Sequence, residues 1–352
     1  MTRAFVIFLS SIATLALVEL SGMLFGHRHL FESEDYYPLE ESTFSFLDTP
    51  NEGKVTRGGV KMPNMGIDCE LEEHGHLEID AHTCNPGSLG NLLSSVYLSA
   101  LRAFQHNNTF TLHCNEDRND PGNVLQHYIS NKVWFMNISE SAPDLCKVCK
   151  TWPHNCRTGL NFAVPMIRET LRQIPPPLDM DDVTIHFRCG DILNNKYQGS
   201  YGYPAYRIYE EYLTAFDSIG ILTGSFDPNI ARPLDAPFIA ACHEIVEDMA
   251  EYFRETFPHA RVTVRSRDTI EESVGRMVHS KQMWCNPSTF CVFPAIATTG
   301  QAFILKTELY PFVENIRNEP NITVVHQGIL SVNKIATKGL RPGDIIDWLR
   351  TS

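Results

Sequence analysis

Short apolar runs alternate with longer amphipathic stretches along most of this chain. In the first half, HLEID and TFTLHC have the composition of β-strands. Between them, NLLSSVYLSALRAFQ repeats its apolar residues with the period of a helix. KVWFMN is a further predicted strand, and LNFAVPMIRETLRQI is a further predicted helix. Strands that alternate with helices in this way indicate a parallel sheet.

The same alternation continues after the segment IPPPLDMDD, residues 174–182. Three consecutive prolines cannot continue a helix and suit a stiff connector, so we place a domain boundary between residues 67–178 and 179–352. The predicted strands beyond it are VTIHFR, RVTVRS, QMWC and AFILKT, and the predicted helices lie in PFIAACHEIVEDMAEYFRETF, DTIEESVGRMVHSK and NPSTFCVFPAIAT. NNKYQGSYGYPAYRI is predicted to be a loop. The expected fold is α/β, with two Rossmann-like, doubly wound domains facing a cleft.

Near the N-terminus, Arg3 precedes an apolar run from Ala4 to Gly26, in which Glu19 is the only charged residue. The run is long enough to span a bilayer, and we favour a signal-anchor over a cleaved signal peptide. Residues 27–66 are polar and rich in turn residues, as expected of a stem. In either form the chain is predicted to enter the secretory pathway, with a Golgi or ER membrane protein as the preferred reading and a secreted protein as the alternative.

Cysteines and glycosylation sequons agree with that compartment. The chain has 10 cysteines, and sequons begin at Asn107, Asn137 and Asn321. In an oxidising lumen the cluster CKVCKTWPHNC (146–156) favours disulfides, although His154 leaves a zinc site open. The net charge of −13 argues against a nucleic-acid partner, because such proteins carry a basic stripe. A local site for a small anion is still compatible with it.

The strand VTIHFR carries an unusual polar pair at its carboxyl end. Side chains alternate along a strand, so His186 and Arg188 share one face, and Gly190 and Asp191 follow in a turn. Open α/β sheets bind ligands at this end of their strands, and arginine suits phosphate groups. The alternative is an Arg188–Asp191 pair that only holds the turn.

A second candidate element is NPSTF, which lies between a predicted strand and a predicted helix. Ser288 is placed as the N-cap, which leaves the amides of Thr289 and Phe290 at a helix N-terminus, where anions bind. An ordinary cap with no ligand is the alternative. Pro294 predicts a kink or an early end of the helix. A third element, GSLGN (87–91), is a glycine turn on the first strand-to-helix connection.

Three further groups of residues have two readings each. Residues 197–212 contain six tyrosines, which could form a platform that stacks on sugars or a loop packed over the cleft. Asp268 opens a predicted helix and is either its N-cap or a neighbour of the ligand pocket. Asp179-Met180-Asp181 has the form of a DxD metal motif, but it precedes its strand, and we interpret it as a solvated connector.

Taken in order, GSLGN, HFRCGD and STF resemble the motifs of the fucosyltransferase superfamily that includes the α1,2-, α1,6- and protein-O-fucosyltransferases. The resemblance covers roughly residues 84–115, 182–193 and 268–306. It implies a GT-B fold, GDP-fucose as the donor, inversion at the anomeric carbon, and no obligatory metal or other cofactor. Another nucleotide-sugar transferase, or an inactive luminal glycan-binding protein on the same fold, are the alternatives.

The resemblance also implies residue roles. Arg188 would bind the β-phosphate and stabilise the leaving GDP, and His186 and Asp191 would support the nucleotide pocket. Apart from the resemblance, Asp191 is the candidate catalytic base. From the resemblance and the residues together, the candidate donor-binding residues are His186, Arg188, Gly190, Asp268, Ser288, Thr289 and Phe290, and the candidate acceptor-side residues are Gly90, Asn91, Tyr201 and Tyr203. The expected partners are a nucleotide sugar and a glycan or glycoprotein acceptor. Many members of the superfamily have a second arginine where this chain has Cys189, and the strand pattern predicts that Cys189 packs on the apolar face.

Overall fold

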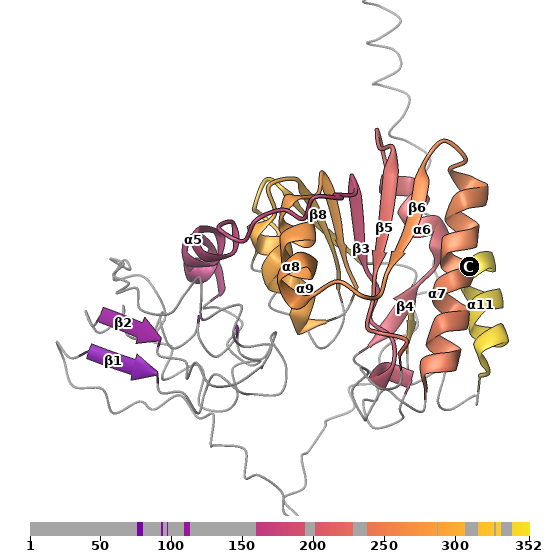
Figure 1. The fold of residues 1–352 in the computed structure, drawn as a ribbon, viewed down its shortest axis with the longest axis horizontal. Coiled ribbons are helices and arrows are strands. Elements are labelled where there is room, and N and C mark those ends of the chain that lie inside the picture. Colours follow the sequence, from indigo (N-terminus) through magenta and orange to yellow (C-terminus); the bar gives the residue numbers. More distant parts are fainter. Residues whose placement is uncertain are drawn as a thin grey trace, which may run out of the picture. The chain divides into compact units, whose positions relative to one another are not determined.

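The computed structural model describes residues 76–79, 93, 97, 109–112, 160–193, 201–227, 238–286, 288–306, 316–326, 329–331 and 340–352. A six-stranded parallel sheet lies at the centre of this part of the chain (Figure 1). Its strands, in spatial order, are β6 (Arg261–Arg265), β5 (Ser218–Leu222), β3 (Val183–His186), β7 (Gln282–Cys285), β8 (Gln301–Leu305) and β9 (Ile322–Val325).

The order of these strands reverses once. The chain enters the middle of the sheet at β3 and adds β5 and β6 on one side, then returns to β7, β8 and β9 on the other. This is the 3-2-1-4-5-6 order of doubly wound sheets, in which ligands bind where the order reverses, outside the carboxyl ends of the strands. Here the reversal lies between β3 and β7.

Helices cover both faces of the sheet (Figure 1). On one face lie α6 (Tyr206–Tyr212), α7 (Ile239–Thr256) and α11 (Pro342–Thr351). On the other lie α8 (Ile270–His279) and α9 (Thr289–Ala297), with α5 (Leu160–Leu171) packed against α9. A short 3-10 helix, η3 (Asp191–Leu193), follows β3, and β4 (Gly202–Pro204) pairs antiparallel with β10 (Ile329–Ser331).

The alternation of side chains along β3 separates two environments. Val183 and Ile185 are fully buried in the core under α6 and α7, which is rich in aromatic rings. Thr184 and His186 therefore face α8 and α9. Trp284, the largest fully buried side chain of the described residues, stacks on Phe303 with ring centroids 4.6 Å apart. Packing of Val183 and Ile185 into the apolar core fixes the rotation of β3 about its own axis. It therefore determines which side chains of β3 point to the face that α8 and α9 cover.

In the N-terminal half, β1 (His76–Ile79) and β2 (Thr109–Leu112) form a parallel pair. Leu93 and Tyr97, in the predicted helix between them, are helical and buried. The two predicted strands are therefore confirmed, and the predicted helix between them is confirmed at these two positions. The segments 1–66, GSLGN, KVWFMN and 146–156 lie outside the described residues, and so do Gly90 and Asn91. None of the helices that the structure describes is both long and apolar enough to cross a bilayer.

The predictions for the second half are confirmed for β3, β6, β7 and β8 and for α7, α8 and α9. The predicted loop over 194–208 was wrong in its last part, which contains β4 and the start of α6. Sequence reasoning also missed β5, whose run SIGIL is bounded by polar residues and glycine. The helix α5 precedes the predicted boundary at residue 178. Its packing against α9 nevertheless ties it to the C-terminal part of the chain.

The connector that holds Asp179 and Asp181 is not simply solvated. Asp181 has a fully buried side chain, whose carboxylate accepts hydrogen bonds from Arg265 Nε at 3.0 Å and Arg276 Nη1 at 3.1 Å. It also lies against Gly220 in β5. The interpretation of this segment as a solvated connector was therefore wrong for Asp181, which is one centre of an ion-pair cluster on the sheet. Asp179 is more than half exposed and joins the same two arginines.

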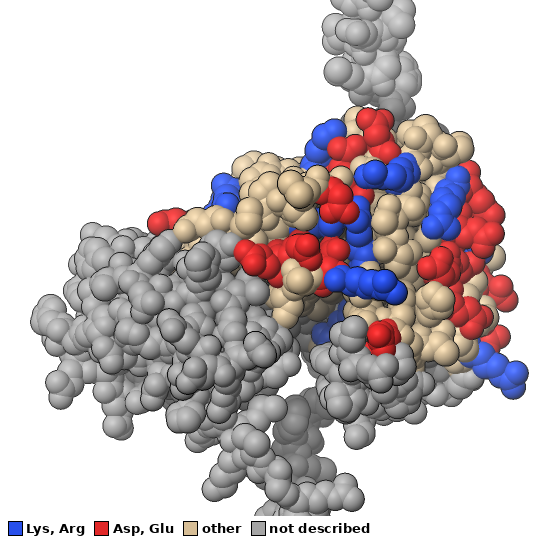
Figure 2. Space-filling model, viewed as in Figure 1, with Lys and Arg blue, Asp and Glu red and all other residues tan. Residues whose placement is uncertain are grey.

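Basic and acidic side chains are interspersed over the described part of the face drawn in Figure 2. Acidic side chains predominate toward the edge formed by α7 and α11 (Figures 1 and 2). No extended basic stripe crosses the part of this face that the structure describes.

Candidate functional site

Two of the three sequence motifs meet where the strand order reverses. HFRCGD begins at the carboxyl end of β3, and NPSTF follows the carboxyl end of β7. The two strands are neighbours, with His186 opposite Cys285. Beyond the last paired residues, the amide of Asn286 donates to the carbonyl oxygen of His186 at 3.4 Å. Doubly wound sheets bind nucleotides at this position, so the fold brings both candidate elements to one potential site.

His186 is a neutral, buried group at this site. Its side chain lies under α9, with its ring 5.4 Å from the ring of Phe290. Burial, together with the positive charge of Arg188, lowers the pKa of His186 to about 3. The imidazole is therefore uncharged at neutral pH. Its Nδ1 atom is buried and has no hydrogen-bond partner among the residues that the structure describes.

Arg188 contributes a half-buried positive charge. Its guanidinium carbon lies 4.6 Å from the centre of the Tyr201 ring, and Nη1 donates to the Tyr201 hydroxyl at 3.4 Å. A cation above an aromatic face is held by the ring's electrons, so Tyr201 positions the guanidinium. Asp191 is the first residue of η3, but its side chain lies outside the described atoms. The Arg188–Asp191 pair therefore remains a prediction.

A disulfide anchors the turn after β3. Cys189 is bonded to Cys242 of α7, and the Gly190 amide donates to the Cys242 sulfur at 2.7 Å. Gly190 has a φ of 75°, a conformation that suits glycine and allows the tight turn. Cys189 also packs against the core, as predicted. Cys189 therefore has a structural role in this turn.

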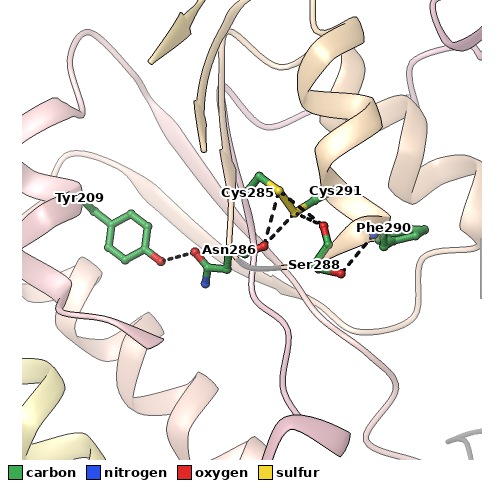
Figure 3. Close-up of a disulfide and its surroundings, with 6 residues drawn as sticks. All are labelled: Tyr209, Cys285, Asn286, Ser288, Phe290 and Cys291. Carbon is green, nitrogen blue, oxygen red and sulfur yellow. Dashed lines mark hydrogen bonds between the residues drawn. A yellow bond between two sulfur atoms is a disulfide. The ribbon is translucent and has the colours of Figure 1, made fainter. Parts of the chain in front are cut away.

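A second disulfide closes the turn after β7. Cys285, the last residue of the strand, is bonded to Cys291 in the first turn of α9 (Figure 3). Ser288 is the N-cap as predicted, because its hydroxyl accepts from the Phe290 amide at 3.2 Å. The Phe290 amide is thus already bonded, and so is that of Cys291, which donates to the Ser288 carbonyl at 3.3 Å. The helix continues past Pro294 to Ala297.

These hydrogen bonds reduce the number of backbone amides at the N-terminus of α9 that could donate to a ligand. The sequence predicted that the amides of Thr289 and Phe290 would bind an anion, but the cap occupies the second of them. The side chain of Thr289 is outside the described atoms. The dipole of α9 still places partial positive charge at this end.

Sequence reasoning assigned no role to Asn286, the first residue of NPSTF. Its side chain is 1% exposed, and its Oδ1 accepts from the Tyr209 hydroxyl at 3.1 Å (Figure 3). Its amide nitrogen is buried and without a partner among the described residues. The available signal was Asn-Pro at the end of a buried strand, a dipeptide that by itself indicates only a turn.

Two predicted site residues lie elsewhere. Asp268 accepts from Arg276 Nε at 2.9 Å and belongs to the ion-pair cluster, whereas the N-cap of α8 is Thr269, which forms a capping box with Glu272. The expectation that Asp268 caps this helix was wrong. Tyr203 is fully buried and stacks on Phe187 with ring centroids 5.1 Å apart, so its ring is not available to stack on a sugar. Tyr201 is partly exposed and stays in the candidate site.

Comparison with protein-family models and with curated proteins gives no match for this chain. Within the described ranges, no cluster of three or more histidine, cysteine, aspartate or glutamate side chains has the arrangement of a metal site.

Proposed function

We propose that the protein is an inverting glycosyltransferase that transfers fucose from GDP-fucose to a hydroxyl of a glycan or glycoprotein. One observation carries the proposal: the HFRCGD and NPSTF motifs meet at the reversal of a doubly wound sheet, where nucleotides bind. A GT-B arrangement, with the β1–β2 unit in a second Rossmann-like domain on the acceptor side, is part of this proposal. So is anchoring of the luminal enzyme in the Golgi or ER membrane by residues 1–26.

In the proposed reaction, an acceptor hydroxyl oxygen attacks the anomeric carbon of fucose from the face opposite to GDP. The bond from that carbon to the β-phosphate oxygen breaks, and its electron pair leaves with GDP. Negative charge develops on the phosphate, where a prepositioned cation lowers the barrier most. Arg188 supplies that cation. The acceptor proton passes to a base, for which Asp191 is the candidate because it directly follows the turn.

The test is the thermal stability of the purified protein with a panel of nucleotides, for the wild type and for Arg188→Ala. A ligand at about 100 times its dissociation constant stabilises the folded state by roughly 2.7 kcal/mol. We expect GDP and GDP-fucose to raise the melting temperature of the wild type but not of Arg188→Ala. Arg188→Ile, which keeps some of the apolar bulk over Tyr201, checks that loss of charge rather than loss of packing is responsible.

The other outcomes separate the alternatives. Stabilisation by UDP or CMP compounds instead of GDP would retain the transferase and reject fucose as the donor sugar. Stabilisation by GDP-fucose without transfer to any glycan acceptor in a broad screen would favour a binding protein. No response of the folded protein to any nucleotide would reject the proposed donor site.

A further inference from the structure

The candidate site contains a buried hydrogen-bond donor in the first residue of NPSTF, to which the sequence analysis gave no role. Asn286 follows β7 directly and precedes the Ser288 cap by two residues, and it is almost completely buried. A buried amide that lacks one partner costs stability, and nearly all such groups in proteins are bonded to protein, water or ligand. A residue with this cost at a ligand-binding edge of a sheet requires an explanation.

The orientation of the amide follows from Tyr209. Burial raises the pKa of the Tyr209 hydroxyl, so the hydroxyl keeps its proton and acts as a donor. The amide oxygen is the acceptor for that proton, at 3.1 Å. The amide nitrogen must then point away from Tyr209, as Figure 3 shows. Asn286 therefore offers donors only, in a direction fixed by a second buried side chain.

The surroundings indicate what such a donor would bind. The cap occupies the amide of Phe290, and the Ser288 carbonyl accepts the amide of Cys291. The same turn therefore has few backbone donors left for an anion at the N-terminus of α9. A side-chain amide beside the turn replaces them without adding charge, while Arg188 supplies the charge from the neighbouring motif.

We propose that Asn286 is a ligand-binding residue, whose Nδ2 donates a hydrogen bond to an oxygen of the bound diphosphate, and that Tyr209 is the residue that positions it. This inference rests on the proposed nucleotide site. A hydrogen bond to a charged group contributes enough that its loss weakens binding roughly 10- to 100-fold.

The experiment is calorimetric titration of GDP and of inorganic pyrophosphate into the purified protein. Asn286→Leu removes the amide at nearly constant volume, and Tyr209→Phe removes only the hydroxyl that orients it. Tyr206→Phe is the matched control, because Tyr206 is a buried tyrosine of the same helix whose hydroxyl bonds to the Ile245 carbonyl. We expect a loss of roughly 10- to 100-fold for Asn286→Leu, a smaller loss for Tyr209→Phe, and wild-type affinity for Tyr206→Phe.

Several results would overturn the inference. Wild-type affinity in Asn286→Leu would show that the amide does not contact the ligand. An equal loss in Tyr209→Phe would show that the effect comes from the broken core bond. A loss with GDP but not with pyrophosphate would reject the diphosphate as the contact.

If Asn286→Leu does not fold, Asn286→Asp keeps an acceptor for Tyr209 and removes the donor. A loss of affinity relative to the wild type that persists at high salt supports the hydrogen bond, whereas a loss that salt abolishes reflects only the added charge and rejects it. The two proposals also fail differently. If the wild type binds neither GDP nor pyrophosphate, the nucleotide site itself is rejected. If it binds both, and Arg188→Ala does not, wild-type affinity in Asn286→Leu rejects this inference alone.

Discussion

The rings of His186 and Phe290 lie 5.4 Å apart, although one ends the first strand of the six-stranded sheet and the other lies in the first turn of α9. The doubly wound order is the reason. The chain leaves β3 toward α6 on one face and leaves β7 toward α9 on the other, while the two strands stay adjacent. The space between the two exits lies next to a neutral imidazole, a half-buried arginine and a helix N-terminus. This combination favours an anionic ligand with polar, uncharged groups.

The neutral state of His186 predicts a pH dependence of stability. Its pKa is about 3 in the folded protein, and that of an unfolded histidine is about 6.5. The unfolded chain therefore binds more protons between these values, and the free energy of unfolding falls as the pH is lowered through this window. From pH 7 to pH 5 this one group accounts for a loss of about 2 kcal/mol.

The measurement is urea denaturation of the wild type and of His186→Gln at both pH values. The variant carries no titratable group at this position, so it should lose about 2 kcal/mol less than the wild type. Parallel losses in the two proteins would mean that the pKa of His186 in the folded protein is close to that of an unfolded histidine.

The two disulfides are predicted to differ in their contribution to stability. Cys189–Cys242 closes a loop with a sequence separation of 53, and Cys285–Cys291 one with a separation of 6. Because the entropy removed from the unfolded chain grows with loop length, the expected losses are about 4 kcal/mol for the first bond and about 2 kcal/mol for the second. Denaturation of the two double Cys→Ala variants tests the order.

The shorter disulfide should matter more for the ligand than for the fold, because it encloses the turn with Asn286 and Ser288. We expect the Cys285/Cys291 double variant to remain folded and to bind GDP more weakly than the wild type. Unchanged GDP affinity in that variant would show that the turn keeps its conformation without the bond.

Gly220 tests the packing of the Asp181 cluster on the sheet. A Cβ atom at Gly220 would lie 2.3 Å from Asp181 Oδ2, in a fully buried carboxylate bound by two arginines. Because neither group can move away without breaking these bonds, Gly220→Ala should lower the free energy of unfolding by about 1–3 kcal/mol. Gly224 has no atom within 4 Å of the equivalent position and is the matched control. Gly224→Ala should leave stability within about 0.5 kcal/mol of the wild type, and equal effects of the two substitutions would contradict this packing.

The sequon at Asn321 is predicted to stay unglycosylated in the folded protein. Its Nδ2, the atom that would carry a glycan, donates to the carbonyls of Thr298 at 3.2 Å and Gly300 at 3.3 Å. Its Oδ1 accepts from Arg168 Nη2 at 3.0 Å, which links α5 to the sheet domain. A glycan would break these bonds. Mass spectrometry of glycopeptides from protein made in a secretory host should find Asn321 unmodified, and an occupied site would show that modification precedes the formation of these bonds.

Sequence alone identified most strands and helices of the six-stranded sheet, because apolar residues recur differently along buried strands and along amphipathic helices. The same pattern indicated Arg188, His186 and the Ser288 cap as candidates, because each can be inferred from its neighbours in the sequence alone. The predictions failed where a residue's role depends on distant neighbours. The six tyrosines after HFRCGD have the composition of a loop, yet Tyr203, Tyr206 and Tyr209 are core residues because α7 and the sheet surround them.

Only the tertiary structure determined the features that depend on contacts between distant segments of the chain. Asp181 is adjacent in sequence to prolines and acids, and only the placement of Arg265 and Arg276 opposite it makes its burial tolerable. Cys189 and Cys242 are paired because the turn after β3 lies against α7, a proximity that no local pattern encodes. Sequence analysis did not identify Asn286 as a candidate site residue. Its amide is a candidate ligand donor only because Tyr209 orients it and because the strand order reverses beside it. Local periodicity determines elements, whereas burial and the direction of a side chain depend on which elements become neighbours.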